Sequence, residues 1–275
     1  MRGTQRVAET LTVGALAMTA SADPRANAER IGASLAAARA AGARLVLTPE
    51  CALTGYPTAA RASLEDLDWA EVRGLEADLD ARAHALGLGL VLGTVSPLAG
   101  AATNDALACG AVDNAVRYRK QCLTPPDRRH FAAGTEPGVV TCAGWRLGLS
   151  ICFDVRFGDV WGELAQSDVD GFVNIAHMAG ADVDPGTKAE VIPAFYATRA
   201  AEWATPLVAC NTSASDRWLD SGHWDARGVR VAAIADGLMV TELRRRDQHA
   251  SWYETLRAEQ RARCSASAGA AGGDS

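Results

Sequence analysis

Short runs of consecutive apolar residues alternate along the chain with stretches in which apolar residues recur every three or four positions. The runs have the length of strands buried on both faces of a sheet, and the spaced stretches have the period of helices. Ile31, Leu35 and Ala38, for example, predict one buried face of a helix over residues 27–41. Strands are expected over residues 11–18, 43–48, 87–96, 104–112, 115–123, 145–152, 170–177, 206–211, 229–235 and 237–243.

Single residues predict several helix ends. The sequence Asp68-Trp-Ala-Glu71 has the outline of a capping box, and the helical spacing that follows it ends at Gly87. Pro193 suits the first turn of a helix running to about Trp203, because a proline there loses no backbone hydrogen bond. This order of strands and helices predicts an α/β protein whose helices cover a largely buried sheet.

The ends of the chain bear on domain organisation. We expect one domain over residues 1–263 and a disordered tail over residues 264–275, which are rich in Gly, Ala and Ser. Arg2, Arg6 and the sequence Ala20-Ser21-Ala22 imitate a signal peptide, but Glu9 and several threonines dilute the apolar patch between them. We therefore expect a strand there, and no run approaches the ~20 apolar residues of a membrane span.

Charge and cysteine content exclude several classes of function. The 275 residues carry 27 Lys and Arg against 33 Asp and Glu, a net charge of −6 that favours neither nucleic acid nor anionic membranes. The densest basic run, residues 244–246, is followed by Asp247 and is interpreted as a solvated turn or strand end. Seven scattered cysteines, without a CxxC motif or zinc-ligand spacing, fit reduced thiols in the cytoplasm, so we expect no metal site.

Three reactive side chains follow directly where apolar runs end: Glu50, Lys120 and Cys152. Ligand sites gather at the carboxyl ends of strands in α/β folds. Each residue also has a plain structural explanation. Glu50 could cap a turn beside Pro49, Lys120 could be a solvated strand end, and unpaired cysteine is most often a buried packing residue.

Taken together, the three residues make chemical sense. A thiol is mostly protonated at neutral pH and needs a base or a nearby cation before it can attack. Glu50 could accept the proton, and Lys120 could favour the thiolate and then stabilise an oxyanion. A cysteine–histidine pair is the weaker alternative, because of the five histidines only His177 ends a strand-like run.

The segments around these residues resemble the nitrilase, or carbon–nitrogen hydrolase, superfamily along nearly the whole chain. The resemblance rests on LVLTPECALTGYP with Glu50, YRKQCL with Lys120 and GLSICFDVRF with Cys152, followed by ATRAAEWATPLVACNTSA and SGHWDARGVRVAA. It implies a four-layer α-β-β-α sandwich and cofactor-free hydrolysis of a non-peptide C–N bond.

The resemblance also implies roles for individual residues. The Cys152 thiolate would attack the substrate carbon, and Lys120 with the backbone N–H of Phe153 would hold the negative charge. Glu50 would act as base, then as acid, and finally would activate water against the thioester. His177 and Met178 would face the substrate, although His177 could equally be a strand-end side chain satisfied by backbone groups. A homo-oligomer is expected, assembled through the helices that flank the nucleophile.

Two departures from the family pattern stand out. Where many members carry a second glutamate, this chain has Asp127, one methylene shorter, and Glu136 lies beyond the following turn. After the nucleophile, Gly158 replaces a common proline, which predicts a looser loop. Arg156 is expected to form an ion pair with Asp154 or Asp159.

The residues after the nucleophile bear on the substrate. The order Cys-aromatic-Asp resembles amidase-like branches of the superfamily, so the expected substrate is a small linear amide, and the expected products are ammonia and a carboxylic acid. If the substrate carries a carboxylate, Arg156 or Lys188 could bind it. A nitrilase, an N-carbamoyl hydrolase and a binding relative that has lost activity are the alternatives.

Overall fold

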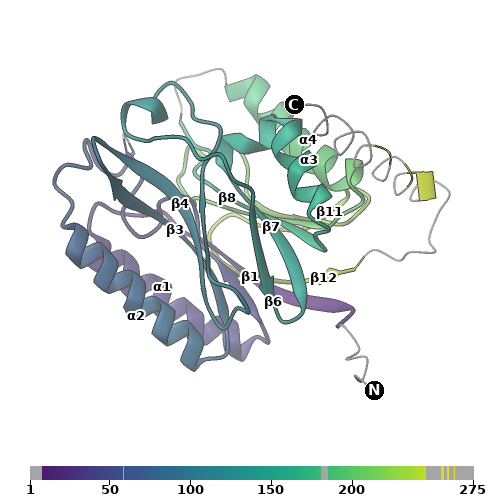
Figure 1. The fold of residues 1–275 in the computed structure, drawn as a ribbon, viewed down its shortest axis with the longest axis horizontal. Coiled ribbons are helices and arrows are strands. Elements are labelled where there is room, and N and C mark those ends of the chain that lie inside the picture. Colours follow the sequence, from purple (N-terminus) through teal and green to yellow (C-terminus); the bar gives the residue numbers. More distant parts are fainter. Residues whose placement is uncertain are drawn as a thin grey trace, which may run out of the picture.

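The computed structural model describes residues 8–57, 59–180 and 185–245, together with residues 255, 256, 259 and 263. Within these residues, two six-stranded sheets lie face to face. Helices α1 (Pro24–Ala40) and α2 (Trp69–Ala85) cover the outer face of one sheet, and α3 (Gly158–Gln166) and α4 (Pro185–Glu202) cover the other (Figure 1). The predicted α-β-β-α sandwich is confirmed.

Each sheet has three parallel strands at its centre and antiparallel strands outside them. The first sheet has the order β12-β1-β2-β3-β4-β5, and the second has the order β11-β10-β9-β8-β7-β6. The first comprises β1 (Thr10–Ala17), β2 (Leu45–Leu47), β3 (Gly89–Leu98), β4 (Ala101–Gly110), β5 (Val116–Arg119) and β12 (Gly237–Arg244). The second comprises β6 (Gly138–Cys142), β7 (Trp145–Ile151), β8 (Gly171–Ala176), β9 (Leu207–Asn211), β10 (Ser221–Trp224) and β11 (Arg230–Ile234).

Strand direction places the ends of four strands near one another. β2 and β3 are parallel, and β5 regains the direction of β3 because two antiparallel steps through β4 separate them. In the second sheet β7 and β8 are also parallel and end together. The backbone N–H of Glu50 donates to the carbonyl of Ala176 at 3.4 Å, which joins the two sheets at this edge. Residues that follow β2, β5, β7 and β8 therefore converge.

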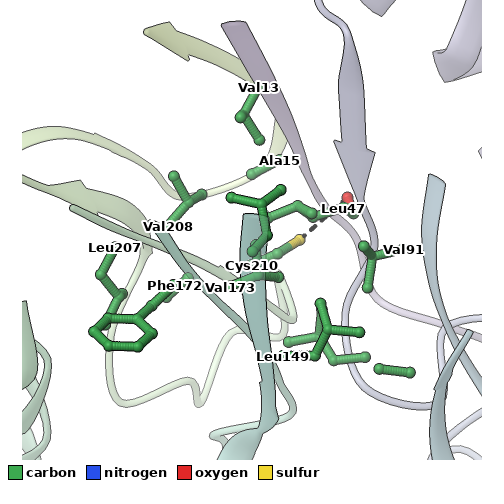
Figure 2. Close-up of a cluster of buried hydrophobic side chains, with 14 of the residues drawn as sticks. Val13, Ala15, Leu47, Val91, Leu149, Phe172, Val173, Leu207, Val208 and Cys210 are labelled. Atoms are coloured by element: carbon green, nitrogen blue, oxygen red, sulfur yellow. Dashed lines mark hydrogen bonds between the residues drawn. The ribbon is translucent and has the colours of Figure 1, made fainter. Parts of the chain in front are cut away.

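The space between the sheets is filled by apolar side chains from both (Figure 2). Leu45 and Leu47 belong to this cluster, whereas Val46 between them belongs to the cluster under α1 and α2. All three are fully buried, as expected for a strand covered on both faces. The Cys210 thiol crosses between the sheets and donates to the Leu47 carbonyl at 3.5 Å (Figure 2).

Two predictions about local structure are wrong. Pro193 lies inside α4, which begins at Pro185, so the proline that suits a first helical turn is the earlier one. The buried face formed by Ile192 and Tyr196 stabilises α4 despite the backbone hydrogen bond that Pro193 lacks. Gly158 is the first residue of α3 rather than part of a loose loop, because glycine, like proline, is compatible with a helix start.

Two strands were not predicted, and the C-terminal tail and the absence of a membrane span were. β6 and β10 are short strands that the apolar pattern did not predict. Residues 264–275, for which a disordered tail is expected, lie outside the described residues. Among the described residues, no helix is long and apolar enough to cross a membrane.

His223 makes the fold sensitive to acid. Its ring is 4% exposed, Nδ1 lies 2.8 Å from Thr241 Oγ1, and Nε2 is buried without a partner among the described residues. Burial lowers the pKa of His223 to about 4, against a smaller opposing effect of Asp225. The unfolded chain takes up this proton near pH 6.5, so His223 makes the folded state less stable as the pH falls from about 6.5 to 4.

We expect the His223→Gln chain, which keeps a polar partner for Thr241, to lose less stability than the wild type over this pH range. The difference is expected to reach about 3 kcal/mol at pH 4. Urea denaturation at pH 8 and at several pH values down to 4 measures it. Equal losses of stability in both chains would show that the pKa of His223 is not lowered in the folded chain.

Candidate active site

Glu50 follows β2, and its carboxylate is held by residues from other strands. Oε1 accepts hydrogen bonds from Asn104 Nδ2 and Lys120 Nζ, each at 2.7 Å, and Oε2 accepts the backbone N–H of His177 at 2.9 Å. The side chain is 1% exposed. The plain explanation of Glu50 as a turn cap is therefore wrong, because its partners come from β4 and from the segments after β5 and β8.

Lys120 follows β5 and is completely buried, so it is not a solvated strand end. Its ammonium lies 2.7 Å from Glu50 Oε1 and 2.8 Å from Asp127 Oδ2. Burial alone lowers the pKa of a lysine, but the negative charge of Glu50 and the other acidic groups outweighs burial and raises the pKa of Lys120 above its ordinary value. A charged ammonium thus lies between two buried carboxyl groups.

Asp127 reaches Lys120 although it is one methylene shorter than a glutamate. It begins the 3₁₀ turn Asp127–Arg129, and its Oδ2 accepts both Lys120 Nζ and the Thr124 backbone N–H, the latter at 3.1 Å. Oδ1 accepts the Tyr56 hydroxyl at 2.5 Å. Burial opposes ionisation, but Lys120 and the hydrogen bonds outweigh it and lower the pKa of Asp127. Glu136 is exposed in the loop before β6.

Cys152 stands at the end of β7 and begins the 3₁₀ turn Cys152–Arg156. Its φ of +47° is uncommon for a residue with a side chain and costs about 1–2 kcal/mol; among the described residues, four other non-glycine residues share a positive φ. Burial, and then Glu50, raise the pKa of the thiol well above its ordinary value, while Lys120 and the His177 backbone N–H oppose this. The resting thiol is protonated at neutral pH and requires a base to become a nucleophile.

Of the remaining predicted residues, His177 contacts this group, and Phe153 and Met178 follow Cys152 and His177 directly in the chain. The His177 ring stacks on Tyr56 with centroids 4.6 Å apart, and burial lowers its pKa, which keeps it neutral. Met178 is buried, and its sulfur lies 3.7 Å from the Tyr196 hydroxyl, which donates to Asn174 Oδ1 at 2.6 Å. The half-buried Phe153 follows Cys152, and its ring packs edge-to-face on the Phe157 ring, with the two centroids 5.2 Å apart. His177 thus contributes through its backbone as well as its ring.

Comparison with known proteins identifies the family. The profile described as carbon-nitrogen hydrolase matches residues 12–241, which is most of the chain. The chain belongs to the carbon–nitrogen hydrolase family. The resemblance seen in the sequence is thereby confirmed.

Curated relatives of this carbon–nitrogen hydrolase are moderately similar. Hydrolases of two Mycobacterium tuberculosis strains, CDC 1551 and H37Rv, are 34% identical over 155 residues, which cover 52% of this chain and 53% of theirs. The match spans about half the length of these relatives. The omega-amidase YafV of Yersinia enterocolitica is 28% identical over 199 residues, or 70% of each chain.

Solved structures share the fold. An amidase from Nesterenkonia sp. superposes with a TM-score of 0.71 and 22% identity over 92% of this chain and 97% of its own. A mutant of that amidase in complex with butyramide gives a TM-score of 0.72 and 22% identity, covering 94% and 98% of the two chains. At this identity the similarity establishes the architecture.

Two residues of the candidate site were missed by sequence reasoning. Tyr56 bonds to Asp127 and stacks on His177, and Asn104 donates to Glu50. Tyr56 lies six positions after Glu50 in the quoted TGYP segment, and Asn104 is a buried polar residue at the start of a predicted strand, beside Asp105. Only the second feature was a usable signal, because a buried amide usually has a hydrogen-bonding role.

The prediction of an ion pair for Arg156 is wrong. Its guanidinium lies over the rings of Phe153 and Phe195, at 5.7 and 5.5 Å from their centroids. The Asp154 carboxylate is turned inward to other donors. No ion pair between Arg156 and Asp159 forms among the described residues.

Proposed function

We propose that this carbon–nitrogen hydrolase cleaves small linear amides through a thioester on Cys152. The observation that carries the proposal is the buried group in which Lys120 bridges Glu50 and Asp127 and both Glu50 and Lys120 act electrostatically on the Cys152 thiol. A protonated thiol, a carboxylate and a fixed ammonium are what nucleophilic attack on an unactivated carbonyl requires.

In the first half of the proposed reaction, Glu50 accepts the thiol proton as the sulfur of Cys152 bonds to the carbonyl carbon. Two of the three N–H groups of Lys120 point at Glu50 and Asp127, and the third, with the backbone N–H of Phe153, stabilises the oxyanion. Glu50 then gives its proton to the substrate nitrogen, the C–N bond breaks, and ammonia leaves the acyl group on sulfur.

In the second half, Glu50 takes a proton from water, and the water oxygen attacks the thioester carbon. The C–S bond breaks, the thiol regains its proton, and the carboxylic acid leaves. We assign Asp127 to holding Lys120 rather than touching the substrate, because both of its oxygens accept hydrogen bonds from protein groups. His177 and Met178 would line the acyl pocket.

Amides are favoured over nitriles and N-carbamoyl compounds by the known relatives. The YafV relative is an omega-amidase, and the Nesterenkonia amidase has been captured with butyramide and, in another mutant, with acrylamide. A panel of amides with and without a carboxylate would also show whether the preferred substrate is charged. Assembly into a homo-oligomer and a cytoplasmic location stay predictions.

A substrate panel assayed for ammonia tests the proposal. The panel contains acetamide, butyramide, monoamides of dicarboxylic acids, the matching nitriles and N-carbamoyl amino acids, with the Cys152→Ser chain as the blank. We expect ammonia from amides and trapping of an acyl group on Cys152 by mass spectrometry. Ammonia from nitriles or carbamoyl compounds alone would reassign the reaction. Silence across the panel, with Cys152 inert to iodoacetamide, would favour a binding protein.

A further inference from the structure

Asp154 is a fully buried carboxylate that the proposed reaction does not use. Its Oδ2 accepts the Tyr118 hydroxyl at 2.8 Å and the Ile151 backbone N–H at 2.9 Å. Its Oδ1 accepts the Cys122 backbone N–H at 2.8 Å. The sequence motif suggested a marker of the amidase-like branch, but the side chain contacts protein donors rather than an open pocket.

The three donors are arranged around the two reactive residues. Tyr118 and Cys122 stand two positions before and two positions after Lys120, and Ile151 directly precedes Cys152. β5, which carries Tyr118, belongs to the first sheet, and β7, which ends at Ile151, belongs to the second. One carboxylate therefore connects the lysine segment of one sheet to the cysteine segment of the other.

This connection matters because the segments that carry Lys120 and Cys152 are far apart in the sequence. The Cys152 backbone is in an unfavourable left-handed conformation, which persists only when surrounding contacts hold it. The hydrogen bond from the Ile151 backbone N–H to the Asp154 carboxylate closes this turn. The Trp161 indole N–H also holds the turn, because it donates to the Asp154 backbone carbonyl at 3.0 Å. A displacement of about 1 Å between a nucleophile and an oxyanion donor costs roughly 100-fold in rate.

We infer that Asp154 is a positioning residue that fixes the Cys152 turn relative to Lys120. The inference rests on the proposed function, since it assigns Lys120 and Cys152 their roles. It differs from a purely structural role in what it predicts: loss of Asp154 slows the chemical step and leaves substrate affinity nearly unchanged.

The test compares Asp154→Asn with Asp105→Asn in the full chain. Asp105 is a matched control because it is 1% exposed and its Oδ2 accepts three donors, from Ser96, Thr103 and Arg117. Its partners lie on β3, β4 and β5, and they include neither Lys120 nor the Cys152 turn. We expect Asp154→Asn to lower kcat by about 100-fold with KM within about threefold, and Asp105→Asn to lower stability while kcat changes less than about threefold.

Tyr118→Phe removes one of the three donors and leaves the Asp154 carboxylate and its two backbone hydrogen bonds in place, so it serves if Asp154→Asn does not fold. We expect it to lower kcat by about fivefold at unchanged KM. An unchanged kcat in Tyr118→Phe would overturn the inference. Equal kcat losses in Asp154→Asn and Asp105→Asn, or a loss confined to KM, would also overturn it.

A second measurement separates this inference from the proposed function. Alkylation of Cys152 by iodoacetamide, followed by mass spectrometry against pH, needs no substrate. If the turn moves away from Lys120, the pH of half-maximal alkylation rises by about one unit in Asp154→Asn and not in Asp105→Asn. This shift in a chain that hydrolyses no amide would support the positioning role while the amidase proposal failed. No shift would count against the positioning role.

Discussion

We expect the Cys152→Ala chain to release no ammonia above background from any amide that the wild type hydrolyses. Alanine has no atom that can form a thioester, and the expected loss of kcat/KM is about 10⁴-fold or more. The side chain is 8% exposed and small, so the fold should survive the change. Ammonia release and urea denaturation, measured on the same preparation, check both halves of this prediction.

Cys51→Ala is the matched control for this experiment. Cys51 is buried, adopts a φ of +52° and adjoins Glu50, so it shares the backbone strain and the surroundings of Cys152. We expect its activity to stay within about threefold of the wild type. Loss of activity in both chains would show that disturbed packing around Glu50, rather than the missing thiol, abolishes the reaction. Full activity of Cys152→Ala would end the thioester proposal.

Replacing Lys120 with methionine is expected to damage both activity and stability. The substitution leaves Glu50 and Asp127, which are 1% and 2% exposed, without the cation that lies between them. Breaking a buried pair by removing one partner costs about 3–5 kcal/mol, because the remaining charge stays uncompensated. We expect a stability loss of that size and a drop in kcat/KM of about 10³-fold, from loss of the oxyanion donor.

Glu50→Gln separates the two effects. It removes one negative charge and leaves Lys120 paired with Asp127, so the stability loss should be only about 1–2 kcal/mol. Its activity should fall as far as that of Lys120→Met, because glutamine cannot accept the thiol proton. The double variant should recover part of the stability lost in Lys120→Met, as interacting sites do. A Lys120→Met chain as stable as the wild type would contradict the assigned electrostatics.

Local patterns in the sequence predicted much of the architecture. The face formed by Ile31, Leu35 and Ala38 is buried in α1, and Asp68 caps α2 by accepting the Ala70 and Glu71 backbone N–H groups. The helix face and the Asp68 cap were predictable because periodicity and capping depend on residues within a few positions of one another, whereas Glu71 of the predicted capping box pairs with Arg25 of α1 instead. Pro193 was misplaced because local preference allowed two prolines to begin the helix, and tertiary packing chose the earlier one.

The contacts of the site could not be read from local patterns. Asn104 and Lys120 meet Glu50 across 54 and 70 positions of sequence. Arg156 stacks on aromatic rings instead of pairing with Asp154, because Asp154 already serves three donors from two sheets. Which partner a charged side chain takes depends on all the groups near it in space.

The sequence by itself determined that Glu50, Lys120 and Cys152 would each stand at the end of a strand, and family motifs marked them as one set. Only the tertiary structure decided that the lysine lies between two carboxylates, that Tyr56 and Asn104 support them, and that Asp154 joins the two reactive segments. The physical reason is that strand ends follow from short-range periodicity, whereas their meeting requires two sheets to pack and bring distant segments within hydrogen-bond range.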